Sequence, residues 1–226
     1  MFIPLRDENP TTRPPVVTIA LIAVNALVFF YQAFSPHGLQ YYVLRMGAIP
    51  YEITSFQALP DFPVARISPF LALIVSMFLH GSFFHLAGNM LYLWIFGNNI
   101  EDYLGHIRFI IFYLAGGLSA ALTHILFNPH STVPMIGASG AIAGVLGAYF
   151  ILCPRARVMT LAFFFFFIRV IPIPAAIILG LWFLMQVLNI GLGGGVAWFA
   201  HIGGFLVGIG LIMVFRRRPR FAGRID

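Results

Sequence analysis

Six long apolar stretches constrain the fold of this chain more than any other feature. They cover about 16–34, 82–100, 107–127, 137–153, 171–190 and 198–215, close to the roughly 20 residues that a helix needs to cross a bilayer. Of the 226 residues, 60% are hydrophobic and only 9% are charged, more apolar side chain than a soluble domain can bury. The sequence predicts an all-α fold, a polytopic membrane bundle of six transmembrane helices.

The arginines predict the orientation of this bundle. Basic residues near helix ends stay on the cytoplasmic side. With the N-terminus inside, only Arg45 and Arg66 fall outside. The arginines on the inner side are Arg6, Arg13, Arg108, Arg155, Arg157, Arg169, Arg216, Arg217, Arg218, Arg220 and Arg224. We therefore expect a cytoplasmic tail at 1–15, a membrane domain at 16–215, a basic cytoplasmic tail at 216–226 and a long outer loop at about 35–68.

Composition excludes several other classes. The formal charge of +6 does not indicate a nucleic-acid partner, because the arginines flank apolar stretches instead of forming one face. The single cysteine, Cys153, excludes an internal disulfide. The first stretch is too long for a signal-peptide core, so we expect no cleaved leader. The Phe-rich segment after Arg155 predicts an interfacial, lipid-anchoring segment before Pro172 and Pro174 open the fifth helix.

Unusual polar residues fall at one depth of the predicted bundle. The second, fourth and sixth helices run from outside to inside, and their first turns carry His85 and Asn89, Ser139, and His201 respectively. At about 1.5 Å of rise per residue, each lies within about 10 Å of the outer surface. His85 and Asn89 are four apart and share a helix face. Polar side chains are expensive in a membrane and tend to mark function.

Small residues favour a close approach of the fourth and sixth helices. Such residues let membrane helices pack tightly, which would bring Ser139 and His201 within hydrogen-bond reach. They are Gly140, Gly144 and Gly147 on the fourth helix, and Gly203, Gly204 and Gly208 on the sixth.

A serine–histidine dyad is the chemistry that these residues suggest. Serine is a weak nucleophile until histidine or lysine takes its proton, and the chain contains no lysine. The seven acids lie in loops, in tails or at the inner end of the second helix, so no orienting carboxylate and no aspartyl pair is expected. The Asn89 amide, a protonated nitrogen of His85 and the Ser139 N–H are candidate donors to an oxyanion. Zinc held by His80, His85 and His201 stays an alternative, although it leaves Ser139 without a role.

These motifs resemble the rhomboid family of intramembrane serine proteases. The stretch "GASG" at 137–140 looks like its GxSG nucleophile motif. The stretch "HGSFFHLAGN" at 80–89 is similar to its histidine and asparagine helix, and "AHIGGFLVG" at 200–208 to its base-bearing helix. The resemblance covers all six predicted helices, in order.

The resemblance implies a role for each site residue. Ser139 would be the nucleophile and His201 the general base, with His85, Asn89 and the Ser139 amide forming the oxyanion hole. Supporting residues would be His80, Gly137, Gly140, Gly204 and Gly208. It implies cleavage of membrane-spanning substrates near the outer face, at small residues in unstable helices, with lipids as the other partners and neither a metal nor a cofactor.

The chain departs from the family's pattern at one position next to the site. Many members carry an aromatic residue four positions after the serine, which packs against the base, whereas this chain has Ala143. We expect Trp198 or Phe205 to orient His201 instead. The Ala138 that precedes the serine differs from the proline of some inactive relatives, so nothing here indicates a dead enzyme.

Access to the site gives further expectations. Water must reach an acyl-enzyme, which predicts a cavity that opens outward. The glycine-rich stretch 191–195 would cap it, and Trp182, Phe183 and Gln186 of the fifth helix would form a lateral gate. The lack of a sizeable soluble domain indicates a prokaryote-like form in a plasma membrane, with both termini cytoplasmic.

Two other functions stay open at this point. A non-catalytic relative could bind and escort membrane clients with the same fold. A channel or small transporter would also line a bundle with polar groups, but it predicts that they continue to the inner face. Below Asn89 and His201 the helices become apolar, and no internal repeat is visible.

Overall fold

The computed structural model describes residues 2–59, 62–164, 167–192 and 195–215. The predicted C-terminal tail, 216–226, lies outside the described residues. Helices occupy each of the six apolar stretches. They are α1 (Val16–Phe34), α5 (Phe83–Leu104), α6 (His106–Phe127), α7 (Ser139–Leu152), α8 (Ala175–Leu188) and α9 (Trp198–Val214).

Length separates these helices into two groups. Among the described residues, α1 and α6 are each long and apolar enough to cross a membrane. A third candidate is a bent pair, in which Pro69–Phe78 meets α5 at 77°. Helices α7, α8 and α9 have 14, 14 and 17 residues, below the roughly 20 of a full span. The protein is thus an integral membrane protein with helical spans, and shorter apolar helices pack against them.

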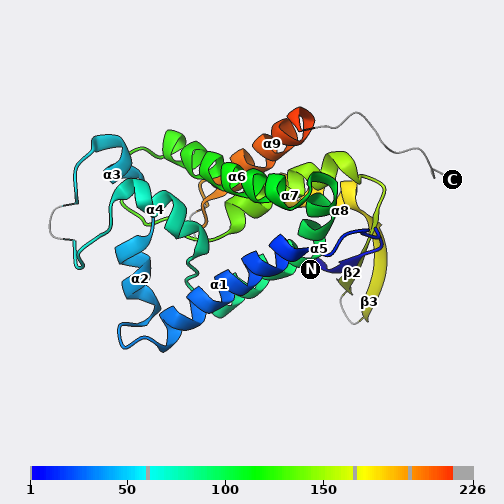
Figure 1. The fold of residues 1–226 in the computed structure, drawn as a ribbon, viewed down its shortest axis with the longest axis horizontal. Helices are drawn as coiled ribbons and strands as arrows, with labels where there is room; N and C mark the ends of the chain where they lie inside the picture. Colours follow the sequence, from blue (N-terminus) through cyan, green and yellow to red (C-terminus); the bar gives the residue numbers. More distant parts are fainter. Residues whose placement is uncertain (1, 60–61, 165–166, 193–194, 216–226) are drawn as a thin grey trace.

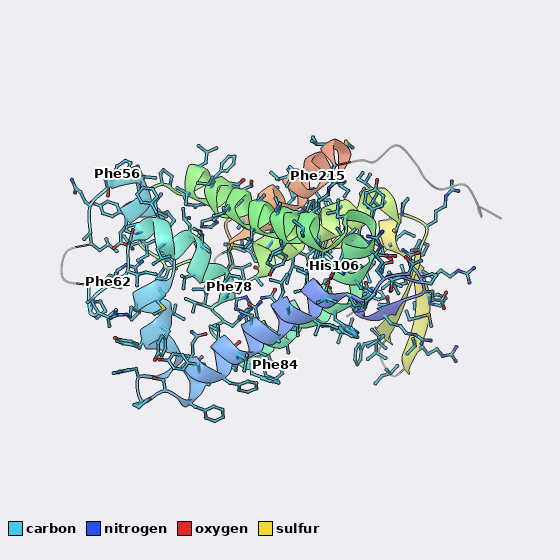
Figure 2. The ribbon with its side chains drawn as sticks, viewed as in Figure 1. Phe56, Phe62, Phe78, Phe84, His106 and Phe215 are labelled. Carbon is cyan, nitrogen blue, oxygen red and sulfur yellow. The ribbon has the colours of Figure 1, made fainter. Side chains whose placement is uncertain are left out.

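Apolar side chains cover the outside of the bundle as well as its core. The core joins α5, α6, α7 and α9 around Phe96, Phe109, Phe112 and Tyr149, which are fully buried. Exposed side chains on α1 include Leu27 and Phe34, and Phe84 at the start of α5 points away from the bundle (Figure 2). This pattern, apolar all round, is that of helices in lipid.

The prediction of an all-α fold is wrong at one end of the molecule. A three-stranded antiparallel sheet lies there, in the order β1 (Phe2–Asp7), β2 (Arg157–Phe164) and β3 (Phe167–Pro174) (Figure 1). The predicted interfacial segment forms the β2–β3 hairpin, because its β-branched and aromatic residues favour strands. Strand β3 runs to Pro174, so the fifth helix begins at Ala175 and not at 171.

Polar contacts join the sheet to the helices. Asp7, the last residue of β1, accepts hydrogen bonds from the Tyr149 hydroxyl of α7 (2.6 Å) and the Asn99 amide of α5 (2.9 Å). Asn9 donates to the Asn99 side-chain oxygen at 2.6 Å. The predicted N-terminal tail is therefore attached to α5 at Asn99 and to α7 at Tyr149. Burial raises the pKa of Asp7 above its ordinary value of 3.8, although these hydrogen bonds oppose the shift.

The raised pKa of Asp7 predicts a pH dependence of stability. The folded protein binds this proton more tightly than the unfolded chain, so the stabilisation is present below pH 3.8 and is lost as the pH rises through the raised pKa. We expect the melting temperature of the wild type, relative to Asp7→Asn, to fall by a few °C between about pH 4 and pH 8. Thermal unfolding in detergent micelles measures this difference, and a constant difference across that range would contradict the prediction.

A buried carboxylate joins three helices at the same end. Glu101 of α5 accepts from the backbone N–H groups of Val17 (2.8 Å) and Thr18 (2.7 Å), in the first turn of α1. Nδ1 of His106, at the start of α6, lies 2.6 Å from Oε1 of Glu101, the same oxygen that accepts from Val17. The first N–H groups of a helix have no intrahelical acceptor, and an anion there also favours the helix dipole.

The long loop after α1 is built from short helices at the opposite end of the bundle (Figure 1). They are α2 (Gly38–Met46), α3 (Pro50–Ser55), α4 (Pro69–Val75) and the 3₁₀ turn η1 (Ser76–Phe78). Arg66 holds this region together through Glu52 (2.8 Å) and the Gly47 carbonyl (2.6 Å). A β-bridge between Ala48 and Met135 then fixes the segment that enters α7. The loop thus positions the residues just before the GASG motif.

Candidate active site

Helix α7 begins at Ser139 because the backbone two residues earlier, at Gly137, has a conformation that is not helical. Gly137 has a φ of +113°, outside the helical region and rarely adopted by residues with a side chain. Its N–H donates to the Ser76 carbonyl at 2.8 Å, which ties the turn to η1. The predicted start at 137 is therefore two residues early. The first cap bond runs from the Ile142 N–H to the Ala138 carbonyl (3.0 Å), so the N–H groups of 139 to 141 have no acceptor within the helix.

Ser139 and His201 meet at the first turns of α7 and α9. Ser139 Oγ and His201 Nε2 are 2.8 Å apart, which is hydrogen-bond distance. Both residues are half-buried, so the pair is partly shielded from solvent but still accessible to it. A hydroxyl in this contact can pass its proton to the imidazole, as an activated serine requires.

Glycines set the distance between the two helices. A Cβ on Gly204 would overlap the Gly140 carbonyl, and one on Gly208 would overlap the Gly144 carbonyl. Each pair is one helical turn from the next, so the contact repeats along both helices. Gly204 follows His201 by one turn, and Gly140 follows Ser139 directly. The backbones therefore touch beside the serine–histidine pair.

The other ring nitrogen of His201 has a partner that the sequence prediction missed. Nδ1 of His201 lies 2.8 Å from Oε1 of Gln186 on α8. Trp198, one of the two predicted orienting residues, meets the imidazole only edge-on, with ring centroids 6.3 Å apart. The signal in the sequence was that Gln186 is the only amide, hydroxyl or charged side chain in α8. A buried amide needs hydrogen-bond partners.

His85, Asn89 and His80 lie around Gly137. A Cβ on Gly137 would come within 2.8 Å of His85 Nε2 and 3.7 Å of Asn89 Nδ2. Asn89 Nδ2 is 3.0 Å from His80 Nε2, and the rings of His80 and His85 are 5.0 Å apart between centroids. One Asn89 N–H thus donates to His80, which leaves its second N–H for another acceptor. These side chains therefore flank the turn that precedes Ser139.

This arrangement does not favour the zinc alternative. Both ring nitrogens of His201 are within 2.8 Å of a protein oxygen. In the part of the chain that the structure describes, no three His, Cys, Asp or Glu side chains are grouped as metal ligands would be.

The predicted gate and cap residues lie on and after α8. The Trp182 ring is 5.9 Å from that of His201, and Phe183 stacks on Phe205 of α9 at 4.7 Å between centroids. Of the predicted cap at 191–195, residues 193 and 194 lie outside the described residues. A gate in α8 and a cap after it stay predictions.

A helical membrane protein whose serine and histidine share a hydrogen bond at two helix starts has the arrangement of a serine hydrolase within a bilayer. The Rhomboid domain model matches residues 68–218, which include every residue of the candidate site. The chain belongs to the rhomboid family of intramembrane serine proteases.

Curated relatives come from several organisms. The chain is 29% identical over 211 residues to "Rhomboid protein 1, mitochondrial" of Saccharomyces cerevisiae, covering 88% of this chain and 53% of the relative. It is 37% identical over 138 residues to "Rhomboid protease GluP" of Bacillus subtilis, covering 60% and 24%. It is 32% identical over 154 residues to "RHOMBOID-like protein 6, mitochondrial" of Arabidopsis thaliana, covering 66% and 44%. The chain thus spans about half the length of the yeast protein and less of the other two.

Proposed function

We propose that this protein is an intramembrane serine endopeptidase that uses Ser139 and His201 as a catalytic dyad. The observation that carries the proposal is the 2.8 Å contact between Ser139 Oγ and His201 Nε2. Family membership supports it, as does the similarity to a bacterial rhomboid protease.

The proposed reaction follows the usual course of acyl transfer. Ser139 Oγ attacks the scissile carbonyl while its proton moves to His201 Nε2, and the imidazolium then protonates the leaving amine. Water deprotonated by His201 hydrolyses the acyl-enzyme and releases the carboxylate. Asn89 Nδ2, a ring N–H of His85 and the Ser139 backbone N–H would stabilise the oxyanion. His80 would support Asn89 by accepting its other N–H.

The substrates we propose are membrane-spanning proteins with small residues and a locally unstable helix near the cleavage site. Helices α7 and α9 are shorter than the roughly 20 residues of a full span, which supports a dyad that lies below the membrane surface. Water would reach it from the side of the α2–α4 region. We propose a prokaryotic plasma membrane as the location, with six spans, both termini cytoplasmic and the α2–α4 region outside.

Covalent labelling tests the proposal. The purified full chain in detergent is treated with a fluorophosphonate, and the modified peptide is identified by mass spectrometry. We expect a single adduct on Ser139, because among the described residues it is the only serine whose hydroxyl contacts an imidazole nitrogen that can take its proton. An adduct on another serine, or none at all, would overturn the assignment of the nucleophile.

Alanine at position 137 should inactivate the site without touching the dyad. A methyl group there would be strained at φ +113° and would press into the His85 ring at 2.8 Å. We expect the rate of fluorophosphonate labelling to fall by about 100-fold, because a displacement of about 1 Å in an active site has that effect. The matched control is Gly88→Ala on α5, where a Cβ meets open space. Equal rates for the two variants would contradict the placing of His85 at this turn.

A further inference from the structure

Helix α8 contributes a polar group that the proposed reaction has not used. Gln186 is buried and stands alone among apolar side chains on this helix. Its Oε1 contacts Nδ1 of His201 at 2.8 Å, and its Nε2 donates to the Trp182 carbonyl, one turn earlier, at 3.0 Å. The amide therefore bridges the backbone of α8 and the imidazole on α9.

The Trp182 carbonyl determines which way the amide faces. A carbonyl oxygen only accepts, so it needs the NH₂ end of Gln186, and this leaves Oε1 toward His201. If the amide were reversed, Oε1 would face the Trp182 carbonyl oxygen, and two acceptors would be in contact without a proton between them. Oε1 also only accepts, so Nδ1 of His201 must carry the proton. Nε2 then holds the lone pair, directed at the Ser139 hydroxyl, which is the tautomer that a general base needs.

The same contact explains how the imidazole is held without an aromatic residue at 143. Ala143 lies in the α7–α9 contact, near Gly204, and cannot stack on the ring. Trp182 lies at a tilt of 37° to the imidazole, which limits its rotation from one side. A hydrogen bond along the ring plane restricts the orientation more than this contact does.

We infer that Gln186 is a positioning residue that fixes the tautomer and the orientation of His201 through the Nδ1 hydrogen bond. This inference rests on the proposed function and deepens it, since Gln186 acts on the dyad without touching the substrate. It assigns to an amide the role that an aspartate has in serine hydrolases with a triad.

Three variants separate this role from a structural one. Gln186→Met keeps the length of the side chain but removes the acceptor. Gln186→Glu keeps the acceptor, because an ionised carboxylate accepts from Nδ1–H, and a protonated one accepts there while donating to the Trp182 carbonyl. Asn189→Leu is the matched control. Asn189, the C-cap residue of α8, donates a side-chain hydrogen bond to a carbonyl one turn earlier, that of Met185 at 2.7 Å, without contact to the imidazole.

The first measurement is the rate of fluorophosphonate labelling of the full chain in detergent. We expect Gln186→Met to lower the second-order rate by about 10- to 100-fold, as expected for a misoriented base. Gln186→Glu should stay within about threefold of the wild type, and Asn189→Leu should equal it. Equal rates for Gln186→Met and Asn189→Leu would overturn the inference.

The second measurement reads the tautomer directly. Nitrogen-15 NMR of histidine-labelled protein distinguishes an N–H nitrogen from a bare one, and His201→Ala identifies the resonances of His201. We expect Nδ1 protonated in the wild type and in Gln186→Glu, and a mixture of tautomers in Gln186→Met. An unchanged tautomer in Gln186→Met would overturn the inference. Absence of labelling in the wild type would instead overturn the proposed function, and the catalytic role of Gln186 with it.

Discussion

Alanine in place of Ser139 should abolish both fluorophosphonate labelling and cleavage of a reconstituted single-span substrate. We expect a loss of at least about 10⁴-fold, because removal of the nucleophile of a serine hydrolase leaves only the catalysis due to binding and the oxyanion hole. The fold should survive, since only the hydrogen bond to His201 is lost, at about 1 kcal/mol. Cleavage is measured by gel electrophoresis of the products, and the fold by thermal unfolding.

The test of Ser139→Ala has a control variant, and other results would favour one of the two rival functions. The backbone carbonyl of Ser119 on α6 accepts a hydrogen bond from the Thr123 hydroxyl at 2.8 Å, and Ser119→Ala keeps this carbonyl. The variant should therefore cleave the substrate at the wild-type rate. Persistent cleavage by Ser139→Ala would refute the dyad. Rescue of a cellular function by Ser139→Ala would favour a protein that escorts membrane clients, and ion flux through liposomes would favour a channel.

Valine in place of Gly204 should separate Ser139 from His201. Its side chain would overlap the Gly140 carbonyl and press on Ala143, whose Cβ lies 3.2 Å from the added carbon. Helix α9 must then move away from α7 and carry His201 with it. We expect labelling to fall by at least about 100-fold, and the stability to fall by about 1–3 kcal/mol.

Gly210→Val is the matched control for this substitution. It lies on the same helix, and a Cβ there meets open space, so it should keep the wild-type rate and melting temperature. If Gly204→Val labels as fast as Gly210→Val, the glycine contacts do not set the distance between Ser139 and His201.

The parts of the site that were predictable from sequence are those that follow from helical periodicity. His85 and Asn89 share a face of α5, and the glycine spacings on α7 and α9 match each other. Polar residues stand out in apolar helices, so the sequence alone distinguishes Ser139 and His201 from their neighbours. The glycine spacing also predicts that these two residues come within hydrogen-bond reach, but which ring nitrogen faces the serine depends on how the two helices cross.

The features that were missed depend on contacts between distant segments. The partner of His201 comes from another helix, α8, and no local pattern relates the two positions. The sheet pairs Phe2 with Ala162, and an apolar aromatic run can be either strand or interfacial segment by composition alone. The short helices between α1 and α5 depend on tertiary contacts, such as that between Arg66 and Glu52, more than on propensity.

The pairing of β1 with β2 also has a consequence for how the protein is made. Strand β1 leaves the ribosome before its partner β2, which follows only after α1, α5, α6 and α7 have been synthesised. At about 5–20 residues per second, that interval is roughly 8 to 30 seconds. For most of this time β1 has no partner strand, and Asp7 has neither the Tyr149 hydroxyl nor β2 to contact. The strand can therefore pair with β2 only after four of the six long helices have been made.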